Sequence, residues 1–312
     1  MIVLYNCPGM MSEDAPQWRA LLTRLMPDID FRVWPDIGRP EEIEFILAWK
    51  HKPGDLKRYP NAKAIFWLGA GVDHLVKDSD LPRQVPIVRL VDDGLTRSMT
   101  EYVVQHVLHY HRRQDEFDAL QRRREWNQLV YPLARHRKVG LLGLGVLGSD
   151  AAEKLLMFGF DVAAWTRSPK SLPGVQSFHG DSGFLPFLKR TEILVCILPL
   201  TPETAGIIDA RSLAALPKGA FVINAARGGH VVDADLIAAL DSGRVAGATL
   251  DVFHEEPLPP DHPYWTHPKV RVTPHVAGQT FAETAAAGIL EGMQSISAGK
   301  PPKNLVDLTK GY

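Results

Sequence analysis

The sequence predicts an α/β fold with two doubly wound parallel-sheet domains, and three observations predict it. The chain has 312 residues, which is long for one domain and suits two. Apolar strand-like runs alternate with helical patterns from the first residues onward, which is typical of parallel sheets with helical connections. A glycine-rich turn, GLGVLG, lies in the middle of the chain rather than after its first strand.

The first 97 residues form the candidate substrate domain. Helical spacing of apolar residues covers residues 18–26, and short apolar runs on either side predict strands. The first strand is followed by NCPG and not by a phosphate-binding glycine loop, so we expect this domain to bind something other than a dinucleotide. The predicted strands are residues 2–5, 31–34, 64–68 and 87–91.

A long helical pattern with a basic end covers residues 98–124 and predicts a connector between the domains. Irregular sequence follows to residue 137. Residues 282–297 are helical again, and two prolines end this helix before an extended C-terminal segment. The strand patterns in between are sufficient for a complete doubly wound sheet: residues 139–142, 161–165, 193–198, 221–224, 247–251 and 270–273.

The glycine-rich turn joins an apolar strand to a helical pattern, as a dinucleotide-binding turn requires. Gly143 permits the tight turn, Gly145 lets a pyrophosphate approach the backbone, and Gly148 lets the helix pack close to the strand. The phosphates would meet free N–H groups at the helix start, where Val146 and Leu147 stand. A bare turn with three glycines is the alternative, and the flanking strand and helix favour nucleotide binding.

The residues after the next strand indicate NADP rather than NAD. In this type of fold an acid about 20 residues beyond the glycines binds the adenosine ribose of NAD, whereas a cation suits the 2′-phosphate of NADP. Thr166 stands in the place of the acid, and Arg167, Ser168 and Lys170 form a polar, cationic cluster. We therefore expect NADP(H), with a solvated loop as the alternative.

Composition excludes several function classes. The net charge is −1 with both signs spread along the chain, which predicts no nucleic-acid partner and no membrane anchor. There are two cysteines, and Cys196 lies in an apolar run, so we expect a buried thiol and a reducing cytoplasm. The first residues have no positive region before their short apolar segment, and no apolar stretch reaches membrane-spanning length, so we expect neither export nor membrane insertion. The histidines form no metal-binding signature, so we expect no metal site.

Three further segments each follow a predicted strand and carry a candidate catalytic residue. These residues are Arg227, Glu256 and His275. The loops after the carboxyl ends of parallel strands line one crevice, so the three side chains are expected to converge although they are far apart in sequence. Glu256 has an acidic neighbour, Glu255, and its spacing from Asp251 selects it.

At these residues the chain resembles the D-isomer-specific 2-hydroxyacid dehydrogenase family. Residues 68–73 and 99–102 make it similar to the glyoxylate/hydroxypyruvate reductase A branch of that family. The resemblance rests on five motifs in the family's order: GLGVLG at 143–148, PLTPET at 199–204, ARG at 226–228, DVFHEEP at 251–257 and PHVAG at 274–278.

The resemblance implies that Arg227 binds the substrate carboxylate and carbonyl, that His275 is the acid/base and that Glu256 is its carboxylate partner. This agrees with the chemistry, because hydride addition to a 2-oxo acid builds negative charge on the carbonyl oxygen, which a protonated imidazole can neutralise. It also implies further cofactor contacts at Leu198, Pro199, Thr204, Ala225, Ala226 and Asp251, and substrate contacts at Trp49, Ala70 and Gly71.

The family further implies a Rossmann domain of residues 98–281 inserted in a smaller flavodoxin-like domain of residues 1–97 and 282–312, substrate between the domains, and a homodimer. The expected reaction is the NADPH-dependent reduction of glyoxylate to glycolate and of hydroxypyruvate to D-glycerate. Two alternatives remain open: another NAD- or NADP-linked 2-oxo acid reductase of the same family, and a dinucleotide-sensing regulator of the same fold.

Overall fold

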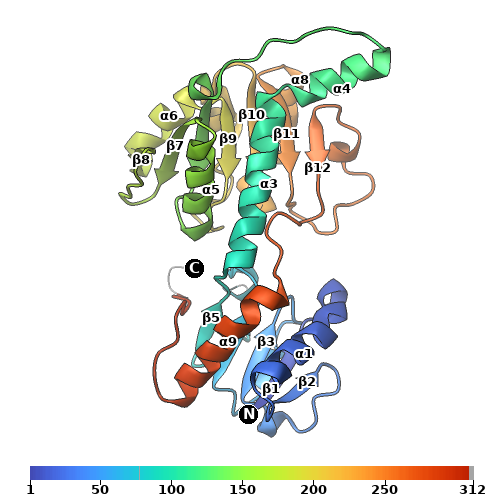
Figure 1. Ribbon diagram of the computed structural model, residues 1–312, viewed down its shortest axis with the longest axis vertical. Coiled ribbons are helices and arrows are strands. Elements are labelled where there is room, and N and C mark those ends of the chain that lie inside the picture. The colour runs from blue at the N-terminus through green and yellow to red at the C-terminus, as the bar shows by residue number, and fades with distance from the viewer. Residues whose placement is uncertain (77, 309–312) are drawn as a thin grey trace. The chain divides into compact units, whose positions relative to one another are not determined.

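Within residues 1–76 and 78–308, which the structure describes, two parallel sheets form the framework of the protein. The computed structural model divides the chain into unit 1, residues 1–95 with the chain from Thr280 onward, and unit 2, Thr96–Gln279. Each unit has its own sheet with helices packed on it (Figure 1). The predicted fold class, α/β with two doubly wound parallel sheets, is confirmed.

The sheet of unit 1 has the flavodoxin-like strand order β2-β1-β3-β4-β5. Helices α1 (Ala15–Leu25) and α9 (Ala282–Ser297) pack against each other, although they come from opposite ends of the chain (Figure 1). Leu305 pairs with Val88 in an antiparallel bridge, so the predicted extended tail joins this sheet. The elements are β1 (Ile2–Asn6), β2 (Asp30–Val33), β3 (Phe45–Ala48), β4 (Ala64–Trp67), α2 (Asp73–Val76) and β5 (Ile87–Arg89).

The sheet of unit 2 has the order β12-β11-β10-β9-β6-β7-β8. This is the Rossmann arrangement, in which the strand order reverses between β6 and β9. Its strands are β6 (Lys138–Leu142), β7 (Asp161–Thr166), β8 (Gln176–His179), β9 (Ile193–Cys196), β10 (Ala220–Asn224), β11 (Val245–Leu250) and β12 (Val270–Val272). Helix α3 (Asp93–His111) begins with the last residues of the first segment of unit 1 and continues into unit 2. The other helices of unit 2 are α4 (Gln114–Arg123), α5 (Val146–Met157), α6 (Gly180–Arg190), α7 (Ala210–Ala215) and α8 (Asp233–Asp241).

Alternate residues of the central strands build a separate core on each face of this sheet. On one face Val139 and Val195 pack with apolar residues of α3 and α5. On the other face Leu142 and Cys196 pack with residues of α6, α7 and α8. Cys196 is the buried thiol that the sequence predicts, and burial raises its pKa to about 12.

Strands β3 and β8 are absent from the sequence prediction. The four residues of β3 are all buried, so this short strand shows no alternation of apolar and polar residues. The residues of β8 are largely exposed, because the strand lies at the edge of the sheet. Neither strand carries the pattern that identifies a half-buried strand, and only pairing with a neighbour defines them.

The prediction of a single helix over residues 98–124 is wrong, because the structure has two separate helices there, α3 and α4. Arg113 lies between them in the left-handed conformation, with φ of 60°. Its guanidinium pairs with Glu116, with Nε 2.6 Å from Oε1, and donates to the carbonyl oxygen of Val130 at 2.7 Å. The contact with Val130 comes from beyond α4, so the helical periodicity of this segment could not reveal the break.

Acid is expected to destabilise unit 2 through His106. This α3 histidine is buried against the ring of Tyr102, and burial lowers its pKa to about 4. The unfolded chain, with an ordinary histidine pKa near 6.5, then binds more protons than the folded one between these values. The free energy of unfolding is therefore highest above pH 6.5 and decreases as the pH falls toward 4, by at most about 3 kcal/mol.

Urea unfolding of wild type and His106→Leu from pH 7 to pH 4 measures this contribution. The variant keeps an apolar side chain and removes the titrating group, so its unfolding free energy should fall less over this range. Equal pH dependence in both proteins would contradict the assignment.

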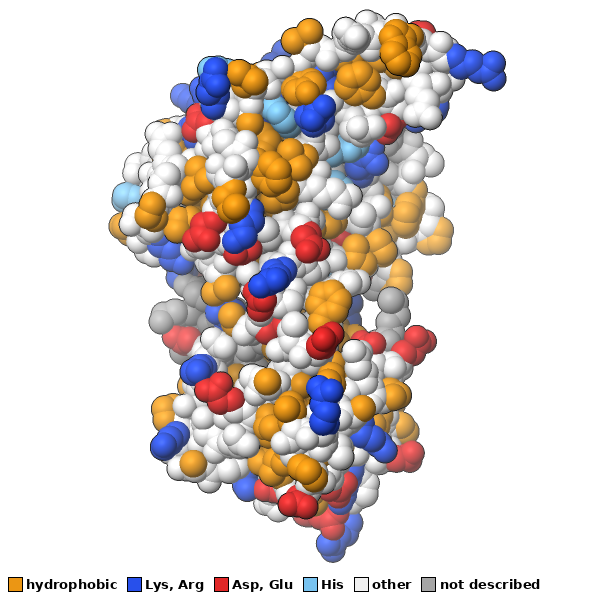
Figure 2. Space-filling model, in the orientation of Figure 1, with side chains coloured by type: hydrophobic (Ala, Val, Ile, Leu, Met, Phe, Trp, Pro, Cys, Tyr) orange, Lys and Arg blue, Asp and Glu red, His pale blue; other side chains and the backbone are white. Residues whose placement is uncertain are grey.

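The nearly equal numbers of basic and acidic residues, 35 and 36, are consistent with a surface of mixed charge. Figure 2 shows them interspersed on the face that it draws. None of the helices within residues 1–76 and 78–308 combines the length and the hydropathy that a membrane span requires.

Candidate active site

Most of the predicted site residues lie in loops that follow the strands of unit 2. These loops leave the C-terminal ends of β6, β7, β9, β10, β11 and β12, which share one edge because the strands are parallel. The strand order reverses between β6 and β9, and the ligand crevice of a doubly wound sheet opens at such a point.

The glycine-rich turn after β6 has the geometry of a phosphate site. Gly143 has φ of +107°, and a Cβ on Gly148 would lie 2.3 Å from the carbonyl oxygen of Gly143. A Cβ on Gly145 would meet nothing within 4 Å, so a ligand can approach the backbone there. No side chain caps α5 at its N-terminus, which leaves the N–H groups of Val146 and Leu147 for a phosphate.

The cluster predicted for the 2′-phosphate follows β7. Thr166 is buried at the end of this strand and donates its hydroxyl to the carbonyl oxygen of Ser168 at 2.7 Å. Arg167, Ser168 and Lys170 are exposed. The Lys170 ammonium donates to the carbonyl oxygen of Leu144 at 3.1 Å. The structure thus brings this cationic loop onto the glycine-rich turn.

The segment after β9 folds into a closed turn. The hydroxyl of Thr204 donates to the carbonyl oxygen of Pro199 at 2.7 Å and accepts from the backbone N–H of Thr201 at 2.9 Å. Leu198 is buried where the strand ends. The carbonyl group of Pro199 is therefore fixed close to the end of β9.

The loop after β10 carries Arg227. Asn224 is fully buried and fastens the loop twice, because its Nδ2 donates to the carbonyl oxygen of Arg227 at 2.9 Å and its Oδ1 accepts from the N–H of Ala226 at 3.1 Å. Ala225 and Ala226 are buried, and the half-buried Arg227 donates to the carbonyl oxygen of Ala226 at 2.7 Å. Asn224 was not predicted as a site residue, and only the structure shows its role.

Gly228 brings the Arg227 loop against the segment after β11. A Cβ on Gly228 would lie 2.0 Å from the carbonyl carbon of Phe253 and 2.3 Å from the backbone nitrogen of His254. Both are backbone atoms, so this approach requires a residue without a side chain. The Nε2 atom of His254 also lies 2.9 Å from the carbonyl oxygen of Val231.

The same segment carries Glu256, which contacts His275 in the loop after β12. Nδ1 of His275 lies 2.8 Å from Oε2 of Glu256, and the side chains are 25% and 21% exposed. Oε1 of Glu256 accepts from the backbone N–H of Phe253 at 3.2 Å. The carboxylate engages Nδ1 and so fixes the orientation of the ring, which leaves Nε2 as the nitrogen for proton transfer.

Asp251 fixes the loop that carries His275. Its Oδ1 accepts from the hydroxyl of Thr273 at 2.6 Å and from the N–H of Val276 at 2.9 Å, and its Oδ2 accepts from the N–H of Ala277 at 2.8 Å. Asp251 is fully buried. Its carbonyl oxygen accepts from the N–H of His275 at 2.8 Å, and His275 has φ of 56°. These bonds hold the histidine in a conformation that residues other than glycine rarely adopt.

The arrangement suits reduction of a carbonyl group in an anionic molecule. It combines a carboxylate-paired histidine with an arginine loop packed against the segment that bears the carboxylate. The open N-terminus of α5 can take the phosphates of a dinucleotide. No cluster of three or more His, Cys, Asp or Glu side chains is arranged for a metal ion among the described residues.

The other predicted substrate residues lie together in unit 1. The rings of Trp49 and Trp67 have centroids 4.8 Å apart, and a Cβ on Gly69 would lie 2.1 Å from the ring of Trp49. Nε1 of Trp67 donates to the carbonyl oxygen of Gly71 at 2.8 Å. Trp49 therefore packs on the loop that carries Ala70 and Gly71.

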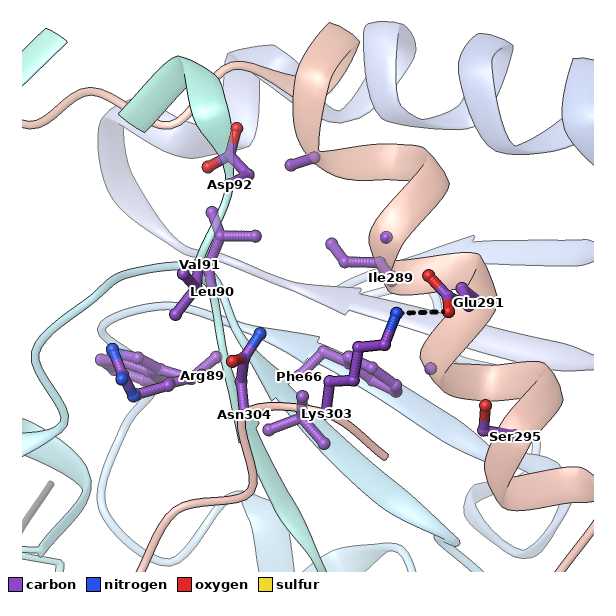
Figure 3. A pocket seen from close by; sticks show the side chains of 15 residues that line it. Phe66, Arg89, Leu90, Val91, Asp92, Ile289, Glu291, Ser295, Lys303 and Asn304 are labelled. Carbon is purple, nitrogen blue, oxygen red and sulfur yellow. Dashed lines mark hydrogen bonds and ion pairs between the residues drawn. The ribbon is translucent and has the colours of Figure 1, made fainter. Parts of the chain in front are cut away.

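A cavity of about 250 Å³ lies elsewhere in unit 1, among β4, β5 and α9. An ion pair of Lys303 and Glu291, 2.8 Å long, stands on one side of it, and Arg89 extends away from that pair (Figure 3). Trp67, which packs on Trp49, is among the residues that line it, whereas Trp49, Ala70 and Gly71 are not.

Comparison with known proteins matches residues 104–277 to the model of the D-isomer specific 2-hydroxyacid dehydrogenase NAD binding domain. Glyoxylate/hydroxypyruvate reductase A of Serratia proteamaculans is 42% identical over 305 residues, which are 96% of this chain and 97% of that protein.

Solved structures agree over the whole chain. A D-isomer specific 2-hydroxyacid dehydrogenase from Xanthobacter autotrophicus Py2, in complex with NADPH and MES, has a TM-score of 0.94 and 43% identity, and the match covers 100% of this chain and 99% of that one. An NADPH-dependent glyoxylate/hydroxypyruvate reductase from Sinorhizobium meliloti, in complex with NADP and sulfate, has a TM-score of 0.91 and 37% identity, with the same coverage.

Proposed function

This chain belongs to the D-isomer-specific 2-hydroxyacid dehydrogenase family, and we propose that it is an NADPH-dependent reductase of glyoxylate and hydroxypyruvate. The products are glycolate and D-glycerate. Relatives named glyoxylate/hydroxypyruvate reductase A and relatives solved with NADPH or NADP support this function. The structural observation that carries this proposal is the contact of His275 with Glu256. The segment that bears Glu256 packs against the Arg227 loop.

In the proposed mechanism Arg227 binds the substrate carboxylate and carbonyl oxygen with its planar guanidinium. NADPH, when bound, supplies the hydride for C2. The imidazolium of His275 donates its proton to the carbonyl oxygen as negative charge grows there. Glu256 keeps the ring oriented and stabilises its charge, while Asp251 holds the loop in place.

The proposed cofactor residues come from the loops at the same edge of the sheet. Gly143, Gly145 and Gly148, with the N–H groups of Val146 and Leu147, hold the pyrophosphate. The 2′-phosphate on the adenosine ribose of NADP(H) is bound by the residues after β7, which are Thr166, Arg167, Ser168 and Lys170. The remaining contacts are proposed at Leu198, Pro199, Thr204, Ala225, Ala226 and Asp251.

Oxidation of NADPH and NADH followed at 340 nm tests the function. We expect NADPH-preferring turnover of glyoxylate and hydroxypyruvate, with pyruvate and phenylglyoxylate as comparison substrates. Preference for one of the comparison acids would assign another reductase of this family. Tight NADPH binding without turnover of any of the four would overturn the reductase proposal and favour a dinucleotide sensor.

Arg167→Ala is expected to raise the KM for NADPH by about 10- to 150-fold, because a hydrogen bond to a charged group contributes roughly 1.5–3 kcal/mol. NADH lacks the 2′-phosphate, so its KM should stay within about twofold. Steady-state kinetics with both cofactors measures the difference, and exposed Arg83→Ala in unit 1 is the control. An unchanged KM for NADPH would remove Arg167 from the site.

We also propose that unit 1 is the substrate domain and unit 2 the NADP-binding domain, close to the expected division at residues 97/98 and 281/282. Trp49 and the backbone N–H groups of Ala70 and Gly71 then contact the oxo acid from unit 1. Their packing in one loop cluster supports a shared role. The two buried thiols suit a cytoplasmic location.

A homodimer is proposed through the segment that follows α4. Trp126 is 97% exposed, Val130 84% and Leu133 58%, which is an unusual run of apolar surface. Light scattering at micromolar concentration should give twice the chain mass for wild type and a lower mass for Trp126→Ser. A monomeric wild type would contradict the proposal.

A further inference from the structure

We propose that His230 is a positioning residue that holds the Arg227 loop against the turn at Pro199. It follows Arg227 by three residues, in the 3₁₀ turn Gly228–His230, and it is fully buried. The idea rests on the proposed function, because these two segments are the ones proposed to bind the oxo acid and the cofactor.

The imidazole ring of His230 spans loops that leave neighbouring strands. Its Nδ1 lies 3.1 Å from the carbonyl oxygen of Arg227, in the loop after β10. Its Nε2 lies 3.3 Å from the carbonyl oxygen of Pro199, in the turn after β9. β9 and β10 pair in the sheet, so the ring connects the two loops directly beyond adjacent strand ends.

Other hydrogen bonds to these two carbonyl groups stay within one loop each. The carbonyl of Arg227 also accepts from Nδ2 of Asn224 at 2.9 Å, and that of Pro199 accepts from the hydroxyl of Thr204 at 2.7 Å. Backbone pairing joins the two chain segments farther along, where the N–H of Gly206 donates to the carbonyl of Gly229 at 2.8 Å. The ring of His230 therefore adds a side-chain link at the carbonyl groups of Arg227 and Pro199, beside backbone bonds from the N–H of Ile208 to the His230 carbonyl at 2.9 Å and from the N–H of Ala225 to the Cys196 carbonyl at 3.2 Å.

Two conservative substitutions separate the two contacts. An asparagine amide reaches the position of Nδ1, and a glutamine amide reaches that of Nε2, and each supplies N–H donors for a carbonyl oxygen. Both partners are carbonyl oxygens, so the ring of His230 donates to both at once only when both of its nitrogens carry a hydrogen. His230→Asn keeps an N–H donor at the Arg227 carbonyl and leaves none at that of Pro199. His230→Gln does the reverse.

Binding of NADPH and of oxalate, a small dianion that probes the oxo-acid site, tests the proposal. Fluorescence titration of the enzyme with NADPH, and of its NADPH complex with oxalate, gives both Kd values. For His230→Gln we expect oxalate to bind about 3- to 10-fold more weakly, with the NADPH Kd within twofold, since one neutral hydrogen bond is lost. His230→Asn should weaken NADPH binding by a similar factor and leave oxalate within twofold.

The control is His106→Gln, which changes another buried histidine that lies on α3, away from these loops. It should leave both Kd values within twofold. If the two His230 variants lower only the midpoint of thermal unfolding, or change both Kd values alike, His230 is a packing residue and the proposal fails. If His230→Gln weakens only oxalate binding and His230→Asn weakens only NADPH binding, while wild type turns over no oxo acid, the reductase function fails and the positioning role stands.

Discussion

Replacing His275 with alanine should reduce kcat for glyoxylate by about 10²- to 10⁴-fold, the range for loss of a general acid. The imidazole is the proposed proton donor, and Glu256 holds it with 2.8 Å between Nδ1 and Oε2. The Kd for NADPH should stay within about twofold, because the phosphate-binding residues belong to other loops. Stopped-flow measurement of a single turnover, together with NADPH fluorescence titration, separates the two effects.

His179→Ala is the control, since His179 is exposed at the end of edge strand β8. It should keep wild-type kcat. A kcat for His275→Ala within tenfold of wild type would mean that the proton comes from another group, and the assignment of the Glu256–His275 pair would have to be abandoned.

Gly228→Ala is expected to lose activity by about 100-fold or more and to lose stability by roughly 1–3 kcal/mol. The new Cβ would lie 2.0 Å from the carbonyl carbon of Phe253, and this backbone cannot rotate away as a side chain can. The loop of Arg227 must then move away from the segment of Glu256. Since catalysis depends on placement within about 1 Å, the activity should fall further than the stability explains.

The neighbouring Gly229→Ala is a matched control. A Cβ on Gly229 would meet Cδ2 of Leu200 at 3.0 Å, and that flexible side chain can shift. Urea unfolding and kcat/KM for glyoxylate should therefore change little. If both glycine variants behaved alike, the close approach of the loops would not be needed for catalysis.

The cofactor fingerprint could be predicted from the sequence because its demands are local. Gly143 needs a positive φ, Gly148 must pack without a side chain, and both follow directly from their place between a strand and a helix. The order of strands and motifs likewise led to Arg227, Glu256 and His275, and the structure brings the last two into contact. Their catalytic roles remain predictions.

Other features required the tertiary structure, because they depend on residues far apart in the chain. Asp251 reaches Ala277 across 26 residues, and His230 reaches Pro199 across 31. The break at Arg113 depends on Val130, beyond the next helix. No local period encodes such contacts, since they arise when strands pair in register and bring their loops together. The sequence by itself determined the fold class, the type of cofactor site and the candidate catalytic residues. Only the tertiary structure decided which buried groups fix those residues in place, because packing between distant segments sets these distances.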